Sequence, residues 1–186
     1  MTSTPTNPTA TLLLCIDMQP VFLKAIADGA LVQRRCAFAL AAAHGLGLPV
    51  IFTEQVPQKL GGTAPELRAL APAAPALGKT SFSALTDAAI QAAVTDSAAA
   101  HLLLCGIETP ICVYQTTLDA LRSGLQVTIL ADAGGARRPQ DAQCCLSALV
   151  SAGAHVLPAE TVFYALLASV QHPFFKTYTQ LVKSHV

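Results

Sequence analysis

One cysteine of this sequence lies where a nucleophile could be activated. The segment GIETPIC, residues 106–112, ends a predicted strand at Gly106 and places Thr109 and Pro110 at the N-cap and first position of a predicted helix. Cys112 then occupies the third helical position, where free backbone N–H groups and the helix dipole favour a thiolate. The same N–H groups are suited to stabilise an oxyanion. The spacing therefore suggests a catalytic cysteine, with a cysteine merely tolerated in a first helical turn as the alternative.

Two charged residues stand at places that suit either chemistry or structure. Asp17 directly follows the apolar run TLLLCI, where a carboxylate can serve a site at the end of a strand or cap the next turn. Lys79 lies in GKTSFSAL, between a small glycine and a polar stretch, where it can act in a site or face solvent. Taken singly, neither residue decides between these interpretations.

Short apolar runs alternate with longer alanine-rich segments, which is typical of βαβ units around a parallel sheet. The runs predict strands at 11–16, 49–53, 78–80, 101–106, 126–131 and 155–157. The segments between and after them predict helices at 31–46, 65–70, 87–97, 110–123, 139–152, 161–170 and 173–183. Residues 54–64, which contain Pro57 and the Gly61-Gly62 pair, are predicted to form a loop.

Right-handed crossovers between such strands predict a three-layer α/β/α sandwich with a Rossmann-like, six-stranded parallel sheet in the order 3-2-1-4-5-6. The topological switch point then lies between the first and fourth strands, at their carboxyl ends, where open α/β sheets bind ligands. Asp17 leaves the first of these strands and Cys112 follows the other. We expect one domain over residues 11–186, preceded by a disordered tail at residues 1–10.

The composition limits the partners of the protein. Only 12% of its 186 residues are charged, against roughly 25% in an average soluble protein, so we expect subunit contacts in a homodimer or homotetramer. The formal net charge is zero, which disfavours nucleic acid. Apolar stretches are too short to span a membrane, and the N-terminus lacks the features of a signal peptide, so we expect a cytoplasmic protein. Five of the six cysteines are expected to be small buried residues: Cys15, Cys36, Cys105, Cys144 and Cys145.

Three motifs in this order resemble those of the isochorismatase-like cysteine hydrolases. They are Asp17-Met18-Gln19 after the first strand, Lys79 through Phe82 near mid-chain, and Gly106 through Cys112 before a helix. The chain is most similar to the isochorismatase-domain-containing subgroup, through TEQVPQKLGGTAPEL, GIETPICVYQTTLDAL and HPFFKTYTQLVK. The resemblance extends from Leu12 to Lys183.

The resemblance implies a catalytic triad that cleaves a C–N bond of a small-molecule substrate, of the amide or carbamoyl type. Cys112 would attack the carbonyl-type carbon, Asp17 would move protons, and Lys79 would hold Asp17 ionised. The resemblance also implies a cis peptide at Ile107–Glu108 and an oxyanion hole formed by the backbone N–H groups of Glu108 and Cys112. It further suggests pocket residues, namely Gln19, Phe22 and Ile107; a polar turn residue is an equally good interpretation of Gln19, and a core aromatic of Phe22.

The sequence departs from the nicotinamidases of this superfamily, which hold a divalent metal through an Asp-x-His motif and a further histidine. The corresponding stretch, TEQVPQKLGG, contains no histidine, so we expect neither a metal nor another cofactor. True isochorismatases cleave a vinyl ether without a cysteine nucleophile. Two alternatives remain open at this point: an ether hydrolase that uses Asp17 with Cys112 as a bystander, and a non-catalytic oligomeric scaffold.

Overall fold

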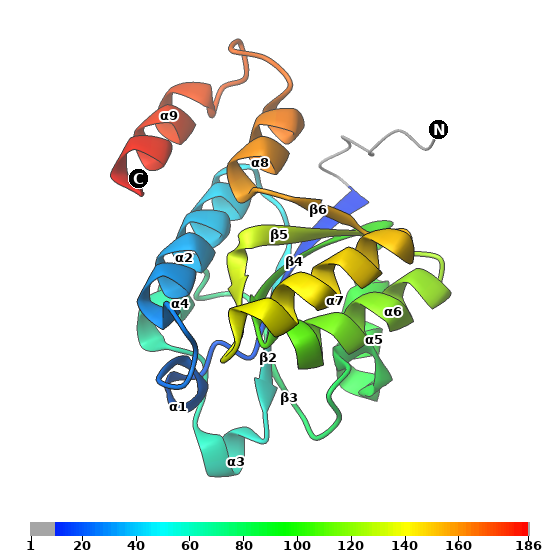
Figure 1. Ribbon diagram of the computed structural model, residues 1–186. Helices are drawn as coiled ribbons and strands as arrows, with labels where there is room; N and C mark the ends of the chain where they lie inside the picture. The colour runs from blue at the N-terminus through cyan, green and yellow to red at the C-terminus, as the bar shows by residue number, and fades with distance from the viewer. Residues whose placement is uncertain (1–9, 186) are drawn as a thin grey trace.

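The computed structural model describes residues 10–185, which form a six-stranded sheet with helices on both faces (Figure 1). All neighbouring strands are parallel, and their order is β3-β2-β1-β4-β5-β6, which confirms the predicted topology. The strands are β1 (Thr11–Ile16), β2 (Val50–Gln55), β3 (Ala76–Lys79), β4 (His101–Ile107), β5 (Gln126–Gly135) and β6 (His155–Leu157).

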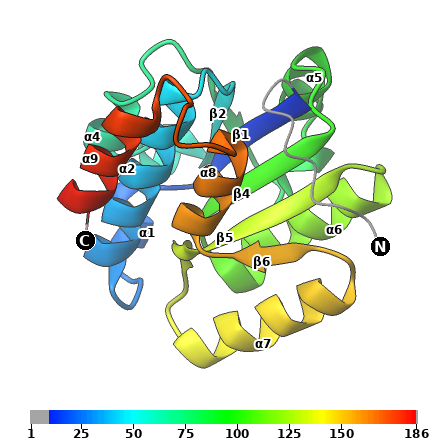
Figure 2. The same ribbon diagram turned by 90° about the horizontal axis from the view of Figure 1, so that it is seen from above.

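Two groups of helices complete the three layers (Figure 2). One face of the sheet carries α2 (Gly29–Gly45), α4 (Pro65–Arg68), α8 (Ala159–Leu167) and α9 (Phe175–Ser184). The other carries α5 (Ala88–Asp96), α6 (Tyr114–Arg122) and α7 (Pro139–Ser151). Short elements at the ends of strands are α1 (Pro20–Leu23), α3 (Pro57–Leu60), the 3₁₀ helix η2 (Ala84–Thr86) and the π-helical turn η3 (Thr109–Val113). The expected sandwich is therefore confirmed.

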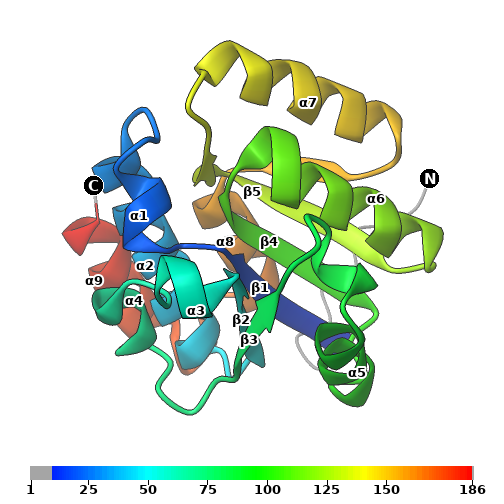
Figure 3. The same ribbon diagram turned by 90° about the horizontal axis from the view of Figure 1, so that it is seen from below.

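The two central strands, β1 and β4, are neighbours and form the predicted switch point. Every residue of β1 and β4 is buried, as their continuous apolar runs predict, and the strands pair in register from Thr11 with His101 to Ile16 with Gly106. Gly106 has a φ of 112°, and a Cβ there would lie 2.1 Å from the backbone oxygen of Ile16. Only glycine permits this close approach. The carboxyl ends of β1 and β4 consequently lie side by side, on the side of the sheet that faces the viewer in Figure 3.

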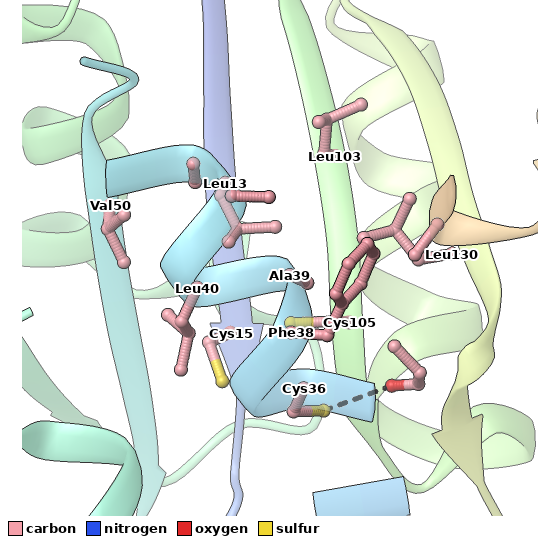
Figure 4. Packing of buried hydrophobic residues seen from close by; sticks show 14 of the residues in the cluster. Leu13, Cys15, Cys36, Phe38, Ala39, Leu40, Val50, Leu103, Cys105 and Leu130 are labelled. Atoms are coloured by element: carbon pink, nitrogen blue, oxygen red, sulfur yellow. Dashed lines mark hydrogen bonds between the residues drawn. The ribbon is translucent and has the colours of Figure 1, made fainter. Parts of the chain in front are cut away.

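Helix α2 packs its apolar face against the sheet (Figure 4). Three of the cysteines expected to be buried lie in this core: Cys15, Cys36 and Cys105. The thiol of Cys36 donates a hydrogen bond to the carbonyl oxygen of Ala133, 3.2 Å away. The same expectation is wrong for the pair on α7, because Cys144 is exposed and Cys145 is only partly buried. Helix α7 buries Leu149 and leaves most of its other side chains toward solvent.

The structure corrects several sequence-based boundaries near the sheet edge. Residues 54–64 are not one loop, because β2 continues through Gln55 and α3 follows. The helix predicted at 110–123 consists of η3 and then α6, and its N-cap is Glu108 rather than Thr109. Helix α1 was not predicted, since four residues are too few to show a helical pattern.

Two further sequence-based expectations concern the N-terminal tail and membrane-spanning helices. The tail predicted at residues 1–10 lies outside the described residues, apart from Ala10. Within residues 10–185, no helix combines the length and apolar character needed to cross a bilayer.

Candidate active site

Asp17 occupies the first position after β1 and is held firmly by its neighbours. Its backbone has a φ of 50°, in the left-handed region that aspartate tolerates better than most side chains. The backbone N–H of Asp17 donates to the carbonyl oxygen of Thr53, 3.0 Å away, and the Thr53 hydroxyl donates to Asp17 Oδ1 at 2.8 Å. The residue is 2% exposed. A carboxylate is thereby fixed at the switch point and almost removed from water.

Lys79 ends β3 and is buried rather than exposed at the surface. Its ammonium group lies 2.7 Å from Asp17 Oδ2, and neither side chain is more than 2% exposed. Nζ also lies 2.5 Å from Gln55 Oε1, 3.2 Å from the carbonyl oxygen of Ser81 and 3.6 Å from Cys112 Sγ. Since an ammonium has three hydrogens, these four neighbours leave none of its donors unused. Lys79 thus links the carboxylate and the thiol.

Cys112 lies in η3, between β4 and α6. Within this turn the backbone oxygen of Glu108 accepts hydrogen bonds from the N–H groups of Ile111, at 3.0 Å, and Val113, at 3.2 Å. The bond from Val113 spans five residues, which is the π-helical pattern often found at functional sites. The peptide bond between Ile107 and Glu108 is cis, as the resemblance implied. The structure therefore brings Asp17, Lys79 and Cys112 together, as the sequence predicts.

The electrostatics of Cys112 differ from the sequence-based expectation of a resting thiolate. Burial, which disfavours a charged sulfur, and the negative charge of Asp17 raise the pKa of Cys112 to about 12, although Lys79 acts in the opposite direction. Cys112 is therefore a protonated thiol at neutral pH and needs a base before it can attack.

A pocket opens beside these three residues, with a volume of about 90 Å³. Two of the predicted pocket residues, Phe22 and Ile107, lie in its lining together with Glu108. The lining also includes three residues that the sequence did not single out: Gln55, Phe82 and Ile111. The local sequence around these three residues did not mark them as pocket residues, because they come together only in the folded protein.

The pocket role predicted for Gln19 is wrong, because hydrogen bonds hold its amide within the protein. Gln19 Nε2 donates to the backbone oxygens of Gln55, at 3.0 Å, and Gly61, at 2.6 Å. Gln19 Oε1 accepts from the backbone N–H of Gln55 at 2.7 Å. Gln19 thus fixes the end of β2, and so positions the Gln55 side chain that contacts Lys79.

The region that holds a metal in nicotinamidases does not supply a ligand set here. Glu54 Oε1 accepts hydrogen bonds from the backbone N–H of Thr63, at 2.7 Å, and from its hydroxyl, at 2.9 Å. Within residues 10–185, no three His, Cys, Asp or Glu side chains cluster so that they could hold a metal ion. These residues do not fit the metal of the nicotinamidases, and the absence of a metal in the working protein stays a prediction.

Known proteins resemble this chain in sequence and in fold. Residues 11–161 match the isochorismatase domain. Isochorismatase domain-containing protein 2 of Xenopus laevis is 38% identical over 171 residues, which cover 92% of this chain and 82% of that protein. The solved structure of MAR1 ribonuclease from Caenorhabditis elegans has a TM-score of 0.89 and 32% identity, over 95% of this chain and 91% of that one.

A further solved structure shares the fold at lower identity. It is the YcaC gene product of Escherichia coli, an octameric hydrolase of unknown specificity, with a TM-score of 0.85 and 22% identity over 96% of this chain and 95% of that one. The family match and the 38% identical relative each extend over most of the sequence. This chain therefore belongs to the isochorismatase domain family.

Proposed function

We propose that this protein is a cysteine hydrolase that cleaves the C–N bond of a small amide or carbamoyl-type substrate through a thioester on Cys112. One observation carries the proposal. The buried ammonium of Lys79 contacts both the carboxylate of Asp17, at 2.7 Å, and the thiol of Cys112, at 3.6 Å, beside a pocket that Asp17 and Cys112 line. A base, a nucleophile and a fixed cation thus meet where a small molecule can reach the sulfur.

The raised pKa of Cys112 is compatible with this mechanism when Asp17 is the base. Much of the rise comes from burial and from the negative charge of Asp17. When Asp17 takes the thiol proton, its own charge disappears as the thiolate forms, so the cluster keeps one negative charge beside Lys79. The ammonium, already 3.6 Å from the sulfur, then stabilises the thiolate as it attacks. Proton transfer and attack are therefore coupled.

The bonds change in two steps. The sulfur of Cys112 bonds to the substrate carbon, the C–N bond breaks, and Asp17 returns its proton to the leaving nitrogen. Asp17 then accepts a proton from water, whose oxygen attacks the thioester, and the C–S bond breaks to release the acid and restore the thiol. In both steps the carbonyl oxygen gains negative charge, for which the backbone N–H groups of Glu108 and Cys112 are our candidate donors.

Two other activities fit the site less well. An ether hydrolase would use Asp17 alone, and would leave the contact between Lys79 and Cys112 without a role. Hydrolysis of RNA, suggested by the name of the Caenorhabditis elegans relative, would require a surface for a polyanion. The net charge of this chain is zero and its pocket holds about 90 Å³, which favours a small molecule.

A substrate screen with point variants tests the proposal. The screen contains amides, ureides, carbamoyl compounds, isochorismate and an oligoribonucleotide. On the best amide-type substrate, Cys112→Ala should lose at least about 1000-fold in kcat/KM, and Cys112→Ser nearly as much, because Asp17 is too weak a base for an alcohol. Cys144→Ala, at an exposed cysteine that is not part of the pocket lining, is the matched control and should keep full activity.

The same variants separate the alternatives. If Cys112→Ala kept most of the activity while Asp17→Asn lost it, the nucleophilic mechanism would be wrong and an ether hydrolase would replace it. If wild-type protein cleaved only the oligoribonucleotide, the small-molecule proposal would fail as a whole.

A further inference from the structure

The pocket is lined by acidic residues but by no basic ones, which limits the ligands that it can bind. The lining residues include two acidic ones, Asp17 and Glu108, and no lysine or arginine among the described residues. Lys79 lies behind Asp17 and is fully buried. Glu108 is paired with Arg137, whose Nε lies 2.8 Å from Glu108 Oε1 and whose backbone N–H is 3.3 Å from Oε2. Both nearby cations are thus already engaged by protein carboxylates.

Apart from Cys112 and Gln55, whose amide is engaged by Lys79 and the backbone oxygen of Thr80, the remaining lining residues are apolar. Phe22 follows β1, Ile107 ends β4, Ile111 lies in η3, and Phe82 follows β3. Phe82 is 56% exposed, although most large apolar side chains of the chain are buried, so it forms the part of the lining nearest to solvent. The pocket has a volume of about 90 Å³, which suits a small ligand.

From these observations we infer that the pocket selects small, uncharged substrates with a short apolar acyl group and rejects substrates that carry a carboxylate. A carboxylate in this pocket would lose its water among four apolar side chains and would meet Asp17 and Glu108 without a free cation. The inference rests on the proposed hydrolysis only in treating the bound molecule as a substrate. The selection against a carboxylate is a property of the cavity itself. Phe82 is the residue through which the selection can be changed.

Three amides of equal size test the selection during turnover. Isovaleramide, malonamide and malonamate each have seven non-hydrogen atoms, and differ in carrying an apolar, a neutral polar or an anionic end group. We expect kcat/KM to be highest for isovaleramide and at least about 100-fold lower for malonamate. Equal values for isovaleramide and malonamate would overturn the inference while leaving the hydrolytic mechanism in place.

A second test does not depend on turnover. Iodoacetamide and iodoacetate are a neutral and an anionic reagent of nearly equal size, and each alkylates a thiolate with loss of iodide. Both reagents react with the same thiolate, so the ratio of their rates at one cysteine does not depend on how much of that thiol is ionised. The ratio at Cys112 can therefore be compared with the ratio at the exposed Cys144 in the same protein, by peptide mass spectrometry. We expect the preference for iodoacetamide to be at least about tenfold greater at Cys112 than at Cys144.

A pair of arginine substitutions identifies the cause of the preference. Phe82→Arg adds a cation at the pocket and should reduce the preference at Cys112 by at least about fivefold. Val170→Arg adds the same charge at a side chain that is 72% exposed and lies outside the pocket lining, and should leave the preference unchanged. If Val170→Arg changed it as much, net charge and not the lining would be responsible, which would overturn the inference.

The outcomes separate this inference from the proposed function. Equal preferences at Cys112 and Cys144 in the wild-type protein would overturn the inference, whether or not Phe82→Arg folds. A protein that hydrolyses no amide but shows the expected preference would refute the proposed hydrolysis and support the selection of neutral ligands.

Discussion

Removing the ammonium of Lys79 should destabilise the fold far more than removing a surface charge. Lys79→Met keeps the apolar stem of the side chain but leaves the Asp17 carboxylate, 2% exposed, with only uncharged side-chain partners, the hydroxyl of Thr53 and the thiol of Cys112, in the described structure. Breaking a buried ion pair by removing one partner costs about 3–5 kcal/mol. Typical domains have about 5–15 kcal/mol of stability, so the variant should remain folded enough to measure.

A double-mutant cycle in urea measures this pair. Asp17→Asn should cost less than Lys79→Met, about 1–3 kcal/mol, because the ammonium keeps Gln55 Oε1 and the carbonyl oxygen of Ser81 as acceptors. The double variant should be more stable than the sum of the single effects predicts, with a coupling of about 1–3 kcal/mol.

An exposed ion pair provides the control for this cycle. The pair between Arg122 and Asp119 has a similar N–O distance, 2.9 Å, but its arginine is 72% exposed, so Arg122→Met should cost no more than about 1 kcal/mol. If the two changes at Asp17 and Lys79 were additive within about 0.5 kcal/mol, the ion pair would not be a unit of this fold, and the reasoning would be refuted.

Three further predictions concern the thiol, the switch point and the assembly. Because the pKa of Cys112 is raised to about 12, alkylation by iodoacetamide through loss of the thiol proton to solvent should accelerate about tenfold per pH unit from about pH 7 to 10; a rate already constant near pH 6 would instead show either a resting thiolate or transfer of the thiol proton to Asp17. Gly106→Ala should lower the free energy of unfolding by more than about 3 kcal/mol, since its Cβ would lie 2.1 Å from the Ile16 oxygen. Gly124→Ala, at a similar positive φ of 82° but with no atom within 4 Å, should cost only about 1 kcal/mol, and equal losses in urea unfolding would contradict the steric argument. Light scattering should report a dimer or tetramer because only 12% of the residues are charged, whereas a mass near 19.3 kDa at micromolar concentration would count against it.

The sheet could be predicted from the sequence because its strands are marked locally. Continuous apolar runs such as TLLLCI identify strands buried on both faces, and 11–16 and 155–157 have the predicted bounds. Right-handed crossovers in the Rossmann-like order then predicted the observed arrangement of the strands, and with it the meeting of Asp17 and Cys112 at one edge. The burial of residues 144–145 could not be predicted in this way. An apolar pattern there predicted burial, but α7 leaves Cys144 exposed.

The sequence by itself determined the fold, the family motifs and the three residues that form the candidate triad, because each has a local pattern or an ordered motif around it. Only the tertiary structure decided that Lys79 is buried, that Gln19 binds backbone instead of lining the pocket, and that Gln55 and Phe82 belong to the site. It also decided the charge state of Cys112, whose pKa is raised by burial and by the negative charge of Asp17. The physical reason is the same in each case. Burial, hydrogen-bond partners and desolvation depend on residues tens of positions apart in the chain, as Lys79 and Asp17 are. The spacing of residues along a short segment does not indicate such distant contacts.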